Sequence, residues 1–169
     1  ILDALIEDEL GQMPWNKVVR TSLLKKAYQA CDRDDIYYKD DVYVCCVMYA
    51  LCRNYAGIKE RLYNYSISTG KSRKMFTEED FREMCKTGQI IDSLGCFFAG
   101  RADAAQGKKL VRIKMEHWLE LLVRTLEEQK LDRTTGIRYI QEAYTFSALE
   151  QTDVAFAREL KTKVMEKLK

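Results

Sequence analysis

The chain has 169 residues, enough for one sizeable domain or two small lobes. Its 28 lysines and arginines nearly balance its 26 aspartates and glutamates, which disfavours a strongly basic nucleic-acid binder. The sequence contains no unbroken apolar run long enough to span a bilayer, so no membrane partner is expected. With one proline and 47% hydrophobic residues, the composition predicts an all-α protein.

Apolar residues recur at helical spacing along most of the chain. A short helix is expected after Thr77, which is placed to cap it, with Asp80 supplying an acid in its first turn. Two polar loops are expected at 56–75 and 100–109. The other predicted helices cover residues 16–31, 39–55, 89–99, 110–126, 132–149 and 154–168.

A recurring unit of helix, polar loop, apolar entry and helix is typical of an EF-hand. Its loop supplies calcium ligands from positions 1, 3, 5, 7, 9 and 12. Phe76 and Ile113 fit the apolar position 8 of two such loops, and Phe81 and Trp118 fit the position after 12. The pattern predicts EF-hand-like helix–loop–helix pairs in two lobes. Residues 1–131 would form an N-terminal lobe with two degenerate units, and residues 132–169 would begin a C-terminal lobe with a third.

The calcium ligands of these loops are missing. In the candidate loop 69–80, basic residues fall at ligand positions, and the loop 106–117 places Lys108 and Lys114 at positions 3 and 9 with His117 at 12. A third candidate loop, beginning near Thr145, has lost its aspartates. Positive charge at these positions repels a divalent cation. We therefore expect no metal and no other cofactor.

The order of segments resembles the neuronal calcium sensor branch of the EF-hand superfamily, and within it the calaxin-like proteins. The resemblance covers residues 18 to 160 and is carried by apolar anchors. These are Lys39-Asp40-Asp41-Val42, Phe76-Thr77-Glu78-Glu79-Asp80-Phe81, Ile90-Ile91-Asp92-Ser93-Leu94 with Phe97-Phe98, Glu116-His117-Trp118-Leu119-Glu120-Leu121-Leu122 and Ile137-Arg138-Tyr139.

The resemblance implies a non-catalytic adaptor that helps attach outer dynein arms to the doublet microtubules of a ciliary or flagellar axoneme, within the cytoskeleton. An amphipathic or coiled-coil helix of a docking-complex protein would enter an apolar groove, independently of calcium. The expected groove residues are Phe81, Met84, Phe97, Phe98, Trp118, Leu121 and Leu122. The basic residues Lys71, Arg73 and Lys74 are candidate contacts for an acidic partner such as tubulin.

Two other classes stay open. The chain could be a degenerate EF-hand regulatory module of a larger enzyme or scaffold, which its opening on Ile1 rather than Met and its missing fourth hand favour. A helical RNA-associated protein is disfavoured by the balanced charge.

Enzymatic motifs are incomplete. Gly70-Lys71-Ser72 lacks the first glycine of a P-loop, because Tyr65 occupies that position. The six cysteines show no zinc-site spacing and are expected to be buried thiols of a reducing, cytoplasmic compartment. His117 is expected to have a structural role, and no enzyme activity is predicted.

Overall fold

The computed structural model describes residues 1–7, 9–11, 16–31, 40–57 and 76–169. These residues form helices and their connections, with no strand in the described ranges, so the all-α prediction is confirmed. In chain order the helices are α1 (Leu2–Ile6), α2 (Thr21–Ala30), α3 (Asp40–Leu51), α4 (Glu78–Cys85), α5 (Thr87–Phe98), α6 (Ala104–Glu128), α7 (Arg133–Ala143), α8 (Ser147–Thr152) and α9 (Val154–Lys167).

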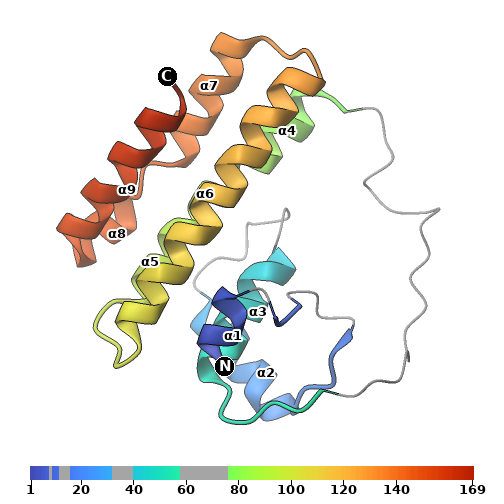
Figure 1. The fold of residues 1–169 in the computed structure, drawn as a ribbon, viewed down its shortest axis with the longest axis vertical. Coiled ribbons are helices and arrows are strands. Elements are labelled where there is room, and N and C mark those ends of the chain that lie inside the picture. Colours follow the sequence, from blue (N-terminus) through green and yellow to red (C-terminus); the bar gives the residue numbers. More distant parts are fainter. Residues whose placement is uncertain (8, 12–15, 32–39, 58–75) are drawn as a thin grey trace.

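The 25-residue helix α6 is the central element (Figure 1). It packs against α5, α1, α7, α4 and α9. One apolar core extends from Leu5 in α1 to Leu168 after α9. The boundary expected between residues 131 and 132 falls in the turn between α6 and α7, and the helices on its two sides share this core.

The N-terminus of α4 forms as the sequence predicts. The Thr77 hydroxyl accepts a hydrogen bond from the Asp80 backbone N–H at 3.1 Å, and the Asp80 carboxylate accepts one from the Thr77 N–H at 2.8 Å. This reciprocal pair satisfies two N–H groups that have no partner within the helix. Phe81 follows at once and is fully buried, so the cap fixes where α4 enters the core.

The segment predicted as one helix over 132–149 is interrupted. Tyr144 and Phe146 are both buried, and Phe146 takes a left-handed backbone conformation with φ of +51°. A new helix, α8, then begins, and its N-terminus is capped from another element. The buried Asp92 of α5 accepts hydrogen bonds from the backbone N–H groups of Ala148 and Leu149 at 3.1 and 2.7 Å. This long-range cap stabilises a helix start that local spacing does not reveal.

Two of the three predicted EF-hand-like loops do not form. Residues 106–117 lie wholly within α6, where Leu110, Met115 and Trp118 are buried on its inner side. Burial of these apolar residues on one helix face favours a continuous helix over a loop. Beyond Thr145, α8 and α9 leave only Asp153 between them, so no twelve-residue loop forms there either. Most of the candidate loop 69–80 lies outside the described residues.

Candidate functional site

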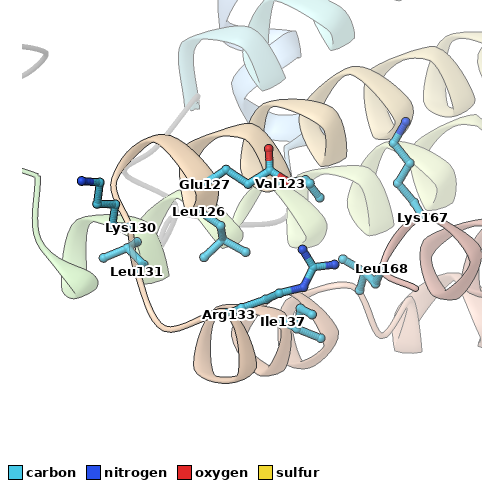
Figure 2. A pocket seen from close by; sticks show the side chains of 9 residues that line it. All are labelled: Val123, Leu126, Glu127, Lys130, Leu131, Arg133, Ile137, Lys167 and Leu168. Carbon is cyan, nitrogen blue, oxygen red and sulfur yellow. The ribbon is translucent and has the colours of Figure 1, made fainter.

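A cleft opens where the end of α6, the turn after it, the start of α7 and the end of α9 meet (Figure 2). Its volume is about 260 Å³. We call it the α6–α7–α9 cleft. Five apolar and four charged residues line it: Val123, Leu126, Leu131, Ile137 and Leu168, with Glu127, Lys130, Arg133 and Lys167.

The floor of the cleft is produced by the way α6 ends. Lys130 has a left-handed backbone with φ of +51°, the Leu131 N–H donates to the Leu126 carbonyl at 3.2 Å, and the Lys130 N–H donates to the Glu127 carbonyl at 3.3 Å. These two bonds define a Schellman motif, which typically brings the residue after the left-handed position against the last helical turn. Leu126 and Leu131 are that apolar pair, and both line the cleft.

A glycine sets how closely α7 approaches this floor. A Cβ atom on Gly136 would lie 2.1 Å from Leu126 Cδ2, so a larger residue would require the Leu126 side chain or α7 to move. The α7 N-terminus is fixed separately, because the Asp132 carboxylate accepts a hydrogen bond from the Thr135 N–H at 2.7 Å. Arg133, the first residue of α7, is therefore held at the edge of the cleft.

A row of ion pairs links α9 and its N-cap to α6. Along α6, residues 108, 112, 116 and 120 lie one turn apart and carry the charges plus, plus, minus, minus. The residues opposite them, at the start of α9 and along it, carry the charges minus, minus, plus, plus. We call this row the α6–α9 ladder; its pairs are Lys108–Asp153 at 2.5 Å, Arg112–Glu159 at 2.6 Å, Glu116–Lys163 at 3.0 Å and Glu120–Lys167 at 2.9 Å.

The ladder specifies a parallel arrangement. Three of its pairs have the same sequence separation of 47 residues, so α6 and α9 run in the same direction side by side. The pair formed by Arg112 and Glu159 is bidentate, and its two hydrogen bonds hold the pKa of Glu159 below its ordinary value. A shift by one turn would bring like charges together at the junction of the plus and minus halves. The last pair ends at the cleft, where Lys167 forms part of the wall.

The rim of the cleft is mainly cationic. Three of its charged residues are basic, and only Glu127 is acidic. Lys167 pairs with Glu120, whereas neither Lys130 nor Arg133 makes an ion pair with any residue of the described ranges. Figure 2 shows the Arg133 guanidinium extending across the cleft toward Leu168, while Lys130 lies at the outer edge. The site therefore offers an apolar surface beside positive charge.

The groove residues expected from the sequence lie elsewhere. Phe81, Met84, Phe98, Trp118 and Leu122 are buried in the core, and Phe97 and Leu121 are half-buried against it. The first five face other parts of this chain and do not line an open groove. The candidate basic contacts Lys71, Arg73 and Lys74 lie outside the described residues.

Three of the six cysteines, Cys45, Cys46 and Cys85, are buried as expected and poorly placed for nucleophilic chemistry, whereas Cys31, Cys52 and Cys96 are partly exposed. Burial raises the pKa of Cys45 to about 11 and those of Cys46 and Cys85 to about 12, so these groups stay protonated at neutral pH. A thiol must be a thiolate to attack or to bind zinc. His117 is exposed on α6. Lys114, expected as a loop residue, is instead a buried residue of α6.

Two features of the sequence indicate the position of α9, whose end forms one wall of the cleft. The ladder's spacing of four residues and its inverted charge order are visible in the sequence. The cleft itself depends on the left-handed Lys130 and on the contact of Gly136 with Leu126, which are tertiary features.

No family model, curated protein or solved structure matches this chain. None of the helices in the described part of the structure has the length and apolar character needed to cross a membrane.

Proposed function

We propose that this protein is a non-catalytic binding protein that holds apolar side chains of a partner helix in the α6–α7–α9 cleft. The observation that carries this proposal is the combination of five apolar lining residues with a charged, solvent-accessible rim. Amphipathic helices dock in this way, with apolar side chains in a groove and polar side chains at its edge. The protonated state of the buried thiols supports the non-catalytic part, because the nucleophilic form of cysteine is the thiolate.

The test compares two matched half-buried residues of α6. Val123 lines the cleft, whereas Leu121 belongs to the groove expected from sequence. Tagged wild-type chain, Val123→Gln and Leu121→Gln are expressed in cells, and bound proteins are quantified by mass spectrometry. We expect Val123→Gln to lower recovery of the main partner about tenfold or more, as at other binding hot spots, and Leu121→Gln to retain it.

Thermal unfolding of both variants controls for loss of the fold. If Leu121→Gln loses the partner and Val123→Gln keeps it, the binding site is the sequence-predicted groove and the cleft proposal fails. If both variants recover the same partners as the wild type, neither surface binds them.

A narrower form of the proposal is attachment of outer dynein arms to axonemal doublet microtubules. It is supported by the resemblance to calaxin-like proteins in the anchors Phe76 and Phe81, which pack in the core around α4. Its support is weakened by the helical state of residues 106–117, because that segment supplied one of the resembling loops. Recovery of coiled-coil docking proteins of the dynein arm in the same experiment would support this form.

The alternative is a regulatory module within a larger enzyme or scaffold. In that case the cleft would hold a helix of the same polypeptide. Detection of the chain in cells only as part of a longer polypeptide, with Val123→Gln altering its domain contacts, would favour this alternative.

A further inference from the structure

The charge around the cleft restricts what can occupy it. Lys130 and Arg133 are unpaired within the described part of the chain. Of the carboxylates within two residues of them, Asp132 caps α7 through the Thr135 N–H and Glu128 pairs with Arg124 at 3.8 Å. The Glu120 carboxylate is similarly engaged with Lys167. Only Glu127 offers a competing negative charge on the lining. An occupant that carries carboxylates would find positive charge with no competing ion pair at Lys130 and Arg133.

The two cations are held by local structure. Lys130 occupies the left-handed position of the Schellman motif, and Arg133 is the first residue of a capped helix. Their backbones are therefore fixed relative to the apolar pair Leu126 and Leu131. Fixed backbones limit how far these charges can lie from the apolar surface, which favours a partner with carboxylates close to its apolar side chains.

The size of the cleft favours a docked segment over an enclosed small molecule. Pockets that enclose small ligands have volumes of about 300–1,000 Å³. The α6–α7–α9 cleft has about 260 Å³ and is open to solvent. It suits one or two side chains projecting from a segment that stays outside.

We infer that the occupant is an acidic amphipathic helix of a protein partner, whose apolar side chains enter the cleft while carboxylates on adjacent turns contact Arg133 and Lys130. This inference rests on the proposed function and adds the chemistry of the partner. Residues three or four apart share a helix face, so one helix presents both the apolar residue and the carboxylates.

The test uses three synthetic helical peptides of about 18 residues, long enough to populate a helix. All carry leucines at the same helical spacing, and the flanking positions are all Glu, all Gln or all Lys. Binding to the wild-type protein is measured by fluorescence anisotropy at low and high salt. We expect the Glu peptide to bind about tenfold more tightly than the Gln peptide, the Lys peptide to bind most weakly, and the differences to shrink at high salt.

Three protein variants test which residues produce the preference for the Glu peptide. Lys130→Gly removes a charge at a backbone position where glycine is favoured, and Arg133→Gln removes the other charge while keeping a long side chain. Each is expected to reduce the preference for the Glu peptide about threefold or more. Arg158→Gln removes an exposed cation from α9 outside the cleft and should leave that preference unchanged. Thermal unfolding checks that all three variants fold.

The outcomes separate this inference from the proposed function. Equal affinities for the Glu and Gln peptides, both lost in Val123→Gln, would overturn the acidic partner and leave the binding cleft intact. An equal effect of Arg158→Gln would also overturn it, because the preference would then reflect overall charge. If none of the peptides binds at about millimolar concentration while dodecanoate binds with one-to-one stoichiometry, the occupant is a small anionic amphiphile and the inference fails.

Discussion

At the scale of single residues, helix packing in this protein depends on where side chains are absent. α5 and α6 approach so closely at Gly107 that an added Cβ would lie 2.2 Å from Cγ of Phe98 and 2.5 Å from its Cβ. Phe98 is fully buried, and its own Cβ cannot move away by rotation of the side chain. The small residue allows the long helix α6 to lie against α5.

We predict that Gly107→Ala destabilises the protein. Alanine in place of glycine favours a helix by about 1 kcal/mol, but overpacking at a fixed contact costs about 1–3 kcal/mol. The expected net result is a lower free energy of unfolding, measured by urea denaturation. Gly57→Ala is the control, since a Cβ there has no neighbour within 4 Å. Increased stability of Gly107→Ala would show that α5 can shift.

Buried thiols predict how stability depends on pH. The pKa of Cys46 is raised by burial to about 12 from the ordinary value of 9.0. Between these values the unfolded chain loses the thiol proton while the folded chain keeps it, so the free energy of unfolding falls as pH rises. The stabilisation that Cys46 gives as a buried thiol is fully present below pH 9. Above pH 9, the free energy of unfolding falls by at most about 1.4 kcal/mol for each pH unit because of this group.

Urea denaturation of Cys46→Ala between neutral and alkaline pH should therefore give a flatter dependence than the wild type. Val47→Ala, a change at a neighbouring fully buried residue without a titrating group, should parallel the wild type. Identical slopes for wild type and Cys46→Ala would contradict a strongly raised thiol pKa.

At the scale of elements, the α6–α9 ladder gives the last helix its direction and register. Its pairs are individually weak, because the side chains are one quarter to three fifths exposed. Their alignment in one row with an inverted charge order nevertheless distinguishes the parallel register from displaced ones. Apolar burial of Phe156, Leu160 and Val164 holds α9 on the core, and we predict that the charges favour this register over displaced ones.

Exchange of charges in the α6–α9 ladder tests whether the ion pairs contribute to the register of α9. Arg112→Glu and Glu159→Arg each place like charges together and should destabilise the protein, whereas the double variant should recover much of the loss. A double-mutant cycle is expected to give a coupling of roughly 0.5–1 kcal/mol that decreases at high salt. Arg124 and Glu128, an exposed pair within α6 at 3.8 Å, form the matched control with a smaller coupling. No coupling between Arg112 and Glu159 would mean that apolar contacts alone fix the register.

At the scale of the whole molecule, residues distant in sequence share one core around α6. α1 contributes the buried Leu5, and the chain end contributes Leu168. The central helix crosses the segment expected to hold a calcium loop, with Lys108 engaged by Asp153 and Lys114 buried. Positive charge at these points and helical geometry both oppose calcium binding.

We therefore predict that calcium at up to about 1 mM, a range that covers sensor and weaker extracellular EF-hand sites, neither binds saturably nor changes the unfolding temperature. Isothermal titration and thermal unfolding with and without a chelator measure these two quantities. Magnesium at the same concentration controls for general ionic effects. Saturable micromolar binding would require a site that includes residues beyond the described ranges, and would restore the calcium-sensor interpretation.

The helical class, the approximate positions of most helices and the Thr77–Asp80 cap follow from the sequence. These features depend on periodicity and on contacts within four residues, both of which can be read from a single chain. The sequence pattern does not indicate the short helix α1, since five residues are too few to show a helical period.

The break before α8, the continuity of α6 and the position of the cleft depend on contacts between helices. Asp92 reaches α8 across more than fifty residues, and Gly136 matters only because Leu126 lies against it. The seven expected groove residues are apolar residues at helical spacing, and that pattern is the same for a core and for an open groove. Which of the two forms depends on the helices that cover them, and the sequence pattern of one helix does not contain that information.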